Sequence, residues 1–363
     1  PYTPDYFKAF APLANELTNI RVNDEGTIDI QYMAKIGNED YLIGHRPERQ
    51  SARNPSASDQ EIKRLQTSLA QVPQTGASIV KTGLDNLDRL HMTRVRLGFD
   101  AKGQELDYIR GDHRITDVVL AGDGDVKESL HDVCRLVTAL KDISHVTAVR
   151  IQSAAFVQSP ADYSRAVINT LGDLNALSVV GPQRLEIETW ALQAGDISDD
   201  HAVLTRRLNN RGITVYVNVP LLGGVNDSAD AIHDMAHALR TAGMEFHHLY
   251  VAGTPLQSVW NHDFPVDSWD VTDIATKVRR EGSGREIPRY IIATPLGEVD
   301  YGLTSTFIRE GDRLKLRLSC YDKSYFDSID EKAGLADEVS FDESGCPVTV
   351  VRGLIKTNDF PVS

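Results

Sequence analysis

The fold is decided by the stretch Asp117-Val118-Val119-Leu120-Ala121-Gly122-Asp123-Gly124-Asp125, which runs from an apolar segment into a glycine-rich turn. A helical repeat follows, because Leu130, Val133, Leu136 and Leu140 recur at spacings of three and four residues. A short apolar run, a turn and an amphipathic helix together make one βα unit. We therefore look for the same strand–turn–helix unit in the neighbouring sequence.

The same βα unit recurs on both sides of this stretch. The predicted strands cover residues 95–99, 117–122, 147–151, 184–188, 214–219 and 245–251. The helices predicted between the later strands cover residues 161–175, 199–211 and 229–243. Alternation of this kind means parallel strands joined by crossover helices, in a barrel or a doubly wound sheet. Six units fall short of the eight of a complete barrel. We therefore predict an α/β fold, a partial six-stranded β/α barrel.

Two flanking regions lack the alternation of strands and helices that is predicted for the barrel. Residues 1–92 form a predicted N-terminal extension, with short strands at 28–32 and 41–43 and a helix over 59–71. The barrel is assigned to residues 93–302. Residues 303–363 form a predicted β-rich tail, because Arg313–Leu318 alternates strictly between charged and apolar side chains.

Composition excludes several classes of function. The 363 residues contain 52 acidic and 38 basic side chains, for a formal charge of −14, which argues against a broad nucleic-acid interface. No apolar stretch approaches the length of a membrane span, and the first residues lack the features of a signal peptide. Only Cys134, Cys320 and Cys346 are present, which argues against a disulfide framework and favours the cytoplasm.

Chemistry in a parallel barrel is expected at the carboxyl ends of its strands. At Gly122, Asp123 and Gly124, the glycines would let a ligand approach the backbone, and the carboxylate could receive an ammonium group or a ribose hydroxyl. An ordinary turn with a helix-capping aspartate is the competing interpretation. The stretch 220–227 leaves the same choice open, with Asp227 or Ser228 as the cap of the next helix.

Histidines occur in the pairs His247-His248 and His262-Asp263. Adjacent residues of a regular strand point to opposite faces, so His247 and His248 are not expected to bind one metal ion. We interpret them as polar packing residues and predict no metal site from them.

Several motifs resemble one enzyme family when they are taken in order. They are Asp107–Arg110, Ile115–Asp123, His145-Val146 with Val149–Ile151, and Leu221–Asp227. Their combination is similar to the lysine 2,3-aminomutase family of radical S-adenosylmethionine enzymes, over roughly residues 93–300. The resemblance implies a partial six-stranded β/α barrel, S-adenosylmethionine and a 4Fe–4S cluster as cofactors, and a small-molecule substrate.

The resemblance also implies roles for individual residues. The glycine-rich turn, with Gly122, Asp123 and Gly124, would hold the amino group of S-adenosylmethionine. Further cofactor contacts would come from Arg150, Gln152, Asn218 and Leu222. Candidate substrate contacts are Glu188, Asp300 and Tyr301.

Three features depart from the family pattern. The family's three-cysteine loop follows its first strand, where three thiolates hold the cluster, but here Asp100 is followed by Ala101–Gln104 without a cysteine. No lysine lies in Thr294–Asp300, so pyridoxal phosphate is not expected. The family's substrate-binding aspartate is replaced by Ala252-Gly253, which argues against lysine 2,3-aminomutation itself.

Two explanations account for the missing cysteines. The link after Asp100 is short for a βα unit, which favours a chain from which a cysteine loop near residues 101–105 has been omitted. The alternative is a degenerate relative that never carried the loop.

Three functions follow from these readings. We favour an enzyme, an isomerase or oxidoreductase, that generates a 5′-deoxyadenosyl radical for hydrogen abstraction from a small molecule. The alternative is a cluster-free, non-catalytic barrel that serves as a binding or regulatory protein. An aldolase-like barrel would need a Schiff-base lysine inside the barrel, and few lysines lie at strand ends. The sequence leaves the choice between a monomer and a homo-oligomer open.

Overall fold

The computed structural model describes residues 19–22, 28–36, 39–46, 54–71, 78–122, 124–176, 183–266, 268–301, 305–310, 313–319, 321–330 and 335–354. The chain divides into two compact units, one of residues 1–53 with 357–363 and the other of residues 54–356. The predicted boundaries at residues 92 and 302 stay predictions.

The first unit contains a three-stranded antiparallel sheet in the order β1-β2-β3. Its strands are β1 (Asn19–Val22), β2 (Ile28–Ile36) and β3 (Glu39–Arg46). The strands predicted at 28–32 and 41–43 lie within β2 and β3, so both are confirmed.

The second unit begins with helix α2 and then alternates strands with helices. Its strands are β4 (Leu87–Arg89), β5 (Arg94–Gly98), β6 (Asp117–Ala121), β7 (Ala148–Gln152), β8 (Arg184–Trp190), β9 (Thr214–Pro220), β10 (Glu245–Ala252), β11 (Arg289–Thr294), β12 (Gly297–Asp300), β13 (Ser305–Glu310), β14 (Arg313–Leu318), β15 (Ser340–Phe341) and β16 (Pro347–Val351). Its helices are α2 (Asp59–Gln71), α3 (Gly103–Gly111), α4 (Leu130–Lys141), α5 (Ala155–Gln158), α6 (Arg165–Ala176), α7 (Asp199–Asn209), α8 (Ala229–Ala242), α9 (Pro255–Asp263), α10 (Ser268–Glu281) and α11 (Lys323–Ile329).

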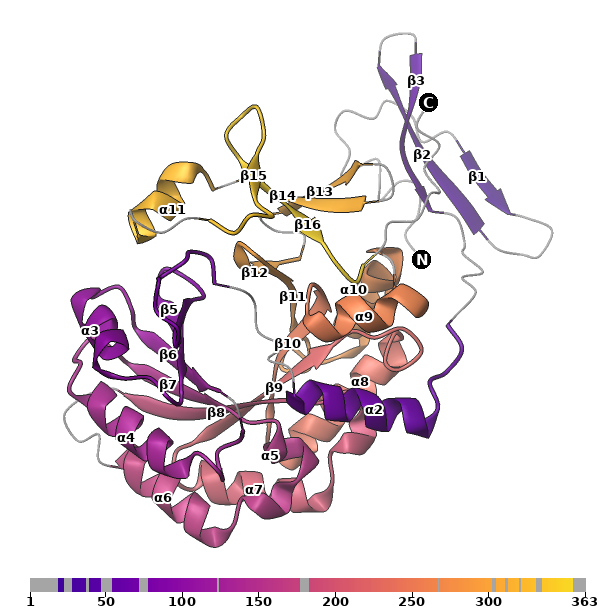
Figure 1. The fold of residues 1–363 in the computed structure, drawn as a ribbon. Helices are drawn as coiled ribbons and strands as arrows, with labels where there is room; N and C mark the ends of the chain where they lie inside the picture. The colour runs from indigo at the N-terminus through magenta and orange to yellow at the C-terminus, as the bar shows by residue number, and fades with distance from the viewer. Residues whose placement is uncertain are drawn as a thin grey trace. The chain divides into compact units, whose positions relative to one another are not determined.

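The second unit is built on a curled nine-stranded sheet with the order β12-β11-β10-β9-β8-β7-β6-β5-β4 (Figure 1). Strands β5 to β11 run parallel, while β4 and β12 are antiparallel at the two edges. The predicted mixed α/β half-barrel is confirmed, but its count of six strands is too low. The missing parallel strand is β11, whose apolar run Ile291-Ile292-Ala293 is too short for periodicity to separate from a loop.

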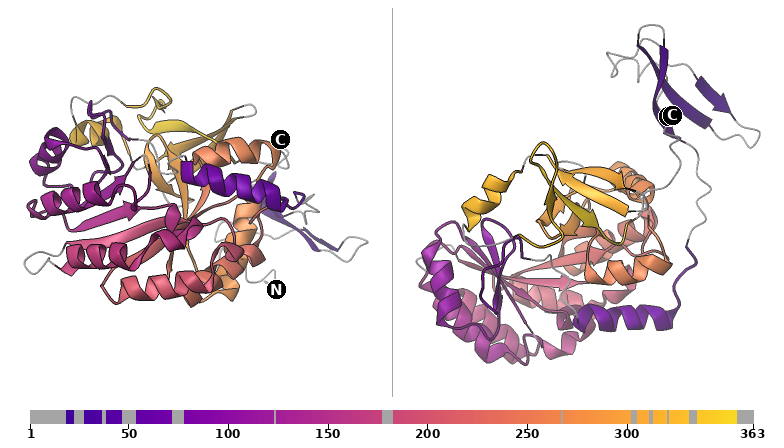
Figure 2. Two further views of the ribbon diagram at one scale, coloured as in Figure 1. Left: turned by 60° about the horizontal axis from the view of Figure 1, so that its bottom comes forward. Right: turned by 45° about the horizontal axis from the view of Figure 1, so that its top comes forward.

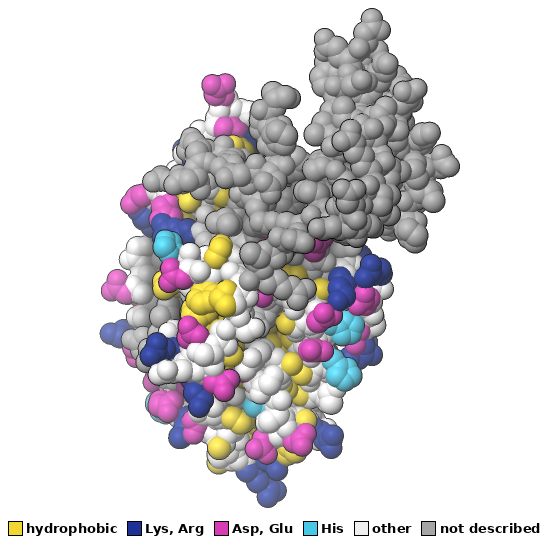
Figure 3. Space-filling model, turned by 90° about the vertical axis from the view of Figure 1, so that its right-hand side faces the viewer, with side chains coloured by type: hydrophobic (Ala, Val, Ile, Leu, Met, Phe, Trp, Pro, Cys, Tyr) yellow, Lys and Arg dark blue, Asp and Glu magenta, His cyan; other side chains and the backbone are white. Residues whose placement is uncertain are grey.

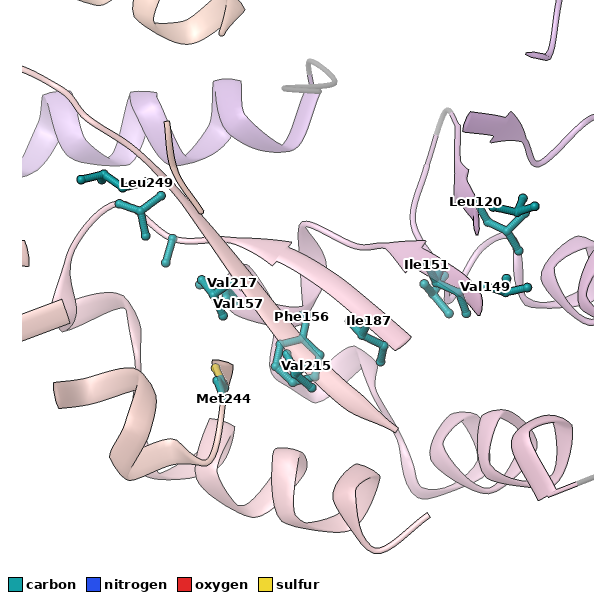
Figure 4. Close-up of a cluster of buried hydrophobic side chains, with 14 of the residues drawn as sticks. Leu120, Val149, Ile151, Phe156, Val157, Ile187, Val215, Val217, Met244 and Leu249 are labelled. Atoms are coloured by element: carbon teal, nitrogen blue, oxygen red, sulfur yellow. The ribbon is translucent and has the colours of Figure 1, made fainter. Parts of the chain in front are cut away.

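Helices cover the convex face of the sheet and form the main core with it (Figure 2). Side chains alternate across each strand, so Val118 and Leu120 of β6 point toward the helices and are buried. Figure 4 shows the same layer in β7 to β9, where Ile151, Ile187 and Val215 pack near Phe156. The apolar side chains of the strands therefore lie mainly on the convex face, and polar side chains lie on the concave face.

The C-terminal segment connects the two sides of the open sheet. Strands β13 to β16 form a four-stranded antiparallel sheet in the order β13-β14-β16-β15, and the strand predicted at 313–318 is confirmed as β14. Near one edge, Arg114 donates to the carbonyl oxygens of Ser328 and Ile329 at 2.6 and 3.0 Å. Near the other, the N–H of Gly253 donates to the carbonyl of Arg352 at 2.9 Å.

The surface carries charges of both signs. Acidic and basic side chains are interspersed on the face drawn in Figure 3. Across the residues described above, none of the helices is both long enough and apolar enough to cross a membrane.

Gly253, which follows β10, gives a direct test of the sheet geometry. Its φ is +94°, and a Cβ there would lie 1.8 Å from the carbonyl oxygen of Ala293 in β11. Gly253→Ala should therefore lower the free energy of unfolding by about 3 kcal/mol or more, measured by urea denaturation. Gly284→Ala is the control, because no atom lies within 4 Å of its added Cβ, and it should change stability by less than about 0.5 kcal/mol. Equal effects of the two changes would contradict this packing.

Candidate functional site

The first glycine-rich turn lies where it was predicted, at the carboxyl end of β6. A Cβ on Gly122 would lie 3.0 Å from the ring of Phe99, so a side chain there would crowd the preceding βα connection. Gly124 has a φ of +85°, which a residue with a side chain rarely adopts. Asp123 lies outside the described residues, so its predicted role stays a prediction.

Asp125, at the end of the same turn, has a structural role. Its carboxylate accepts a hydrogen bond from the hydroxyl of Ser153 at 2.6 Å and another from the N–H of Ala155 at 2.9 Å. These bonds tie the β6 turn to the start of α5. Asp125 therefore does not cap α4, the helix that follows its own turn, whose N-cap residue is Ser129. A ligand role for the turn would rest on its glycine backbone.

The second turn lies beneath helix α2. Leu222 is buried in one apolar cluster with Leu65 and Leu69 of α2 and with Trp190 and Tyr250. These last two residues lie on the concave side of β8 and β10, toward the carboxyl ends of the strands. Helix α2, predicted over 59–71, is confirmed, and its apolar face covers this part of the carboxyl end of the barrel.

Two glycines make this close approach feasible. A Cβ on Gly223 would lie 2.1 Å from the carbonyl oxygen of Phe264, and one on Gly224 would lie 2.3 Å from that of Pro55. Ser228 caps α8, because its side chain accepts a hydrogen bond from the backbone N–H of Ala231. Of the two predicted caps, Asp227 and Ser228, the second is confirmed. The turn 220–227 thus serves packing and capping in this structure.

A charged network lies on the concave face at the centre of the sheet. Arg150 of β7 donates to Glu188 of β8 at 2.9 Å and to Glu186 at 3.0 and 3.1 Å. Gln152 donates to the same Glu188 at 2.7 Å. Glu186 and Glu188 are only 1% and 4% exposed. Burial would lower the pKa of Arg150, but the charges of Glu188 and Glu186 outweigh it and raise the pKa.

A second ion pair spans the opening of the half-barrel. Arg94 of β5 donates to Glu298 of β12 at 2.6 Å, and the hydroxyl of Tyr250 donates to the same carboxylate. Burial would raise the pKa of Glu298, but the charge of Arg94 and these hydrogen bonds lower it to about 2. Burial and the nearby Glu298 raise the pKa of Tyr250 well above its usual value. Glu298 is therefore an ionised acceptor and Tyr250 a neutral donor at pH 7.

The two adjacent histidines correct a prediction. His247 and His248 were expected on opposite faces of a regular strand, but their ring centroids are 3.7 Å apart and both line one cavity. The reason is an irregularity in β10, whose register with β9 shifts between Phe246 and His248. Within the described ranges, no group of three His, Cys, Asp or Glu side chains is placed to hold a metal ion.

Burial keeps both histidines uncharged. Burial, followed by the charge of Arg150, lowers the pKa of His247 to about 4. Burial, followed by His247, lowers the pKa of His248 to about 2. A neutral imidazole has one hydrogen-bond donor and one acceptor, so each ring can donate a hydrogen bond to a polar partner or accept one from it.

These side chains surround a cavity of about 420 Å³, which we name the amino-end chamber. The name follows from its position, since Arg94, Asp117, Ala148 and Arg289 are the first residues of β5, β6, β7 and β11. Its polar lining includes Arg94, Asp117, Arg150, Glu186, His247, His248, Arg289, Glu298 and Asp300, and its aromatic lining includes Tyr321 and Tyr325. The chamber lies at the end opposite to the strand ends where chemistry was expected.

The other predicted site residues, Asp300, Tyr301 and Asn218, lie at different places in the sheet. Asp300 lines the amino-end chamber and accepts a hydrogen bond from Arg289 at 2.8 Å. Tyr301 follows it, and its N–H donates to the carbonyl of Tyr290. Asn218 is fully buried and is paired in register with His248 on the neighbouring strand.

The structure thus brings some predicted residues together and separates others. Arg150 and Asp300 line one chamber, and Gln152 and Glu188 join it through hydrogen bonds. The predicted residues Gly122, Gly124 and Leu222 do not line that chamber.

The described residues do not fit an iron–sulfur cluster at the expected position. The link from β5 to α3 is closed, because Ala101 is fully buried and Arg135 donates to the carbonyl oxygens of Phe99 and Ala101 at 3.1 and 3.0 Å. The whole crossover between β5 and β6 runs from Phe99 to Thr116, which exceeds the dozen or so residues that parallel strands need. Chain length therefore gives no reason to expect an omitted segment.

The two cysteines among the described residues do not offer an alternative cluster site. Cys134 lies on α4 and Cys346 lies before β16, both as free thiols, and Cys320 is outside the described residues. Three thiolates on one loop are what the expected cluster requires.

Comparison with known proteins shows distant similarity to aminomutases. A protein named as an L-lysine 2,3-aminomutase in Aquifex aeolicus is 24% identical over 205 residues, which cover 56% of this chain and 53% of that protein. The L-lysine 2,3-aminomutase of Escherichia coli is 22% identical over 146 residues, which cover 40% and 41%. The chain thus spans about half the length, or less, of these relatives. This similarity supports a relationship to the radical S-adenosylmethionine group at low identity.

Other comparisons add little. A radical SAM methyltransferase from Sphaerobacter thermophilus is 14% identical, with 80% of this chain and 82% of that chain covered at a TM-score of 0.33. No protein-family model matches the chain.

Sequence reasoning gave no site role to Arg94, Tyr250 and Glu298, and it interpreted His248 as a packing residue. The alternation of Arg94 and Arg96 with buried Val95 and Leu97 is a signal of a strand whose polar side faces inward. This signal is present in the sequence, but it lies at the amino end of the strand, opposite to the end where barrel chemistry is expected. Glu298 gave no local signal, because its partner Arg94 is distant in sequence.

The Arg150 network predicts a large effect of a single substitution. Arg150→Met would leave the buried Glu188 without a cation and Glu186 with Arg184 alone, so the free energy of unfolding should fall by about 3–5 kcal/mol. Arg211→Met is the matched control, because the Arg211–Asp173 pair is exposed, and it should cost about 0.5 kcal/mol or less. Chemical denaturation of both variants measures the difference. A small and equal loss in the two would mean that the Arg150 network contributes no more than a surface ion pair.

Proposed function

We propose that this chain is a cluster-free relative of the lysine 2,3-aminomutases, whose half-barrel binds a small molecule as a binding or regulatory protein. The proposal keeps the family relationship that the aminomutase similarity supports. It replaces radical generation with ligand binding in the amino-end chamber.

The closed link between β5 and α3 carries this proposal. The main chain of Phe99 and Ala101 is bound by Arg135, and the N–H of Lys102 donates to Glu105 at 2.8 Å. These contacts satisfy the polar groups of the link and pack it against the following helices. A cysteine loop inserted here would have to replace these contacts or project away from them.

The amino-end chamber supports the binding half of the proposal. Small-molecule sites are concave, range from about 300 to 1,000 Å³ and place a few polar groups on a preformed wall. The chamber is of this size, and its polar side chains are fixed by ion pairs. Helix α2 meanwhile covers part of the carboxyl end, where the resemblance implied S-adenosylmethionine.

A radical S-adenosylmethionine enzyme is the second candidate. The observation that favours it is the similarity to aminomutases, which extends over 205 residues. Its substrate would be a small molecule other than lysine, because the expected aspartate and lysine positions are changed.

Anaerobic reconstitution separates the two candidates. The full chain is incubated with ferrous iron, sulfide and reductant, desalted, and assayed for bound iron and for 5′-deoxyadenosine formed from S-adenosylmethionine. The proposal predicts that iron after desalting does not exceed the level of a variant in which all three cysteines are replaced by serine. It also predicts that no 5′-deoxyadenosine forms.

An L-lysine 2,3-aminomutase treated in parallel is the positive control for reconstitution. Retention of about four irons per chain, together with S-adenosylmethionine cleavage, would overturn the proposal and establish the second candidate.

A further inference from the structure

The amino-end chamber contains a buried imidazole without a partner. His248 is 3% exposed, lines the chamber, and has no hydrogen-bond partner on either ring nitrogen among the described residues. Buried polar atoms in folded proteins are nearly always paired, and leaving one unpaired costs about 1–3 kcal/mol. His248 therefore indicates a partner that enters from the chamber.

A second unpaired side chain lies beside it. Asn218 is fully buried, and neither its amide nitrogen nor its amide oxygen has a partner within the same part of the chain. Asn218 of β9 is in register with His248 of β10, so the two side chains lie next to each other on the sheet. Asn218 does not itself line the chamber, so His248 is the unpaired side chain that a ligand in the chamber can reach. The His248 ring offers a donor or an acceptor there according to its tautomer.

The charges in the chamber do not favour an anion. Three arginines line it, but each already has an acidic partner: Arg94 with Glu298, Arg150 with Glu186 and Arg289 with Asp300. Asp117 adds a further carboxyl group to the lining. Burial keeps His247 and His248 neutral through pKa values lowered to about 4 and about 2. An added anion would therefore meet no uncompensated positive charge.

Aromatic rings flank the unpaired nitrogens. The ring centroids of His247 and His248 lie 3.7 Å apart, and the ring of Tyr216, which does not itself line the chamber, packs 4.9 Å from that of His247. Tyr321 and Tyr325, which belong to the C-terminal segment, also line it, with centroids 4.8 Å apart. Aromatic surfaces of this kind favour a flat ring that can pack against them.

We propose that the amino-end chamber binds a planar, uncharged heteroaromatic compound of the nucleobase type, whose polar edge pairs with His248. Such a ring carries donors and acceptors side by side, which matches the two neighbouring imidazoles that line the chamber. This proposal rests on the proposed binding function and specifies its ligand class. It places the site at the amino ends of the strands, away from the glycine-rich turn.

The test uses the full chain and four free bases as probes: adenine, hypoxanthine, cytosine and uracil. Isothermal titration at pH 7 should give saturable binding of at least one base with a Kd below about 1 mM. His248→Leu should weaken that binding about tenfold or more, because it removes both ring nitrogens. His262→Leu is the matched control, since His262 is exposed on α9, and it should bind as the unchanged chain does.

A second readout covers the case in which His248→Leu fails to fold. In the unchanged chain labelled with ¹⁵N-histidine, the bound base should shift the ring-nitrogen resonances of one buried, neutral histidine that does not titrate between pH 5 and 8. Absence of that shift with a bound base would overturn the proposal. Failure of all four bases to bind, or binding of benzoate or phosphate in their place, would overturn it as well.

This test and the reconstitution test fail independently. Base binding to a chain that retains iron would overturn the proposed cluster-free function and leave the chamber ligand standing. Absence of base binding in a chain that retains no iron would overturn the chamber ligand alone.

Discussion

The structure depends on the mutual neutralisation of charges on the concave face of its sheet. A complete barrel would fill this space with apolar side chains in layers. Here Arg150 is enclosed by Glu186 and Glu188, and Arg94 is paired with Glu298 across the opening. A buried charge without its partner is strongly destabilising, so each of these residues requires the others. The Arg94–Glu298 pair also joins the first parallel strand to the last antiparallel one, and so holds the two sides of the half-barrel together.

That constraint explains why the cavity lies at the amino ends of the strands. The carboxyl end is partly covered by α2, whose Leu65 and Leu69 pack with Trp190 and Leu222. The glycines at 223 and 224 admit the segment leading into α2 at van der Waals distance. At the amino ends, the arginine side chains that line the chamber are paired as ions, and His248 has no hydrogen-bond partner in the part of the chain that the structure describes. Stability and ligand recognition are thus supplied by the same side chains.

Much of this fold follows from the sequence, and the reasons differ between elements. Apolar periodicity located α2 and most parallel strands, and turn chemistry located the Ser228 cap. The irregularity in β10 could not be predicted, because Phe246-His247-His248 has no glycine or proline to mark it. The Arg94–Glu298 pair could not be predicted either, since it depends on the curvature of a sheet formed by the intervening residues. The candidate site could therefore not be predicted from local sequence patterns, because it depends on the tertiary structure.

The central claim is that the first βα crossover is closed and carries no cysteine loop. Digestion of the purified protein with a protease that cleaves before aspartate, followed by tandem mass spectrometry, tests it directly. The account predicts the uninterrupted peptide Asp100-Ala101-Lys102-Gly103-Gln104-Glu105-Leu106. A longer peptide with cysteines between Asp100 and Asp107 would contradict it.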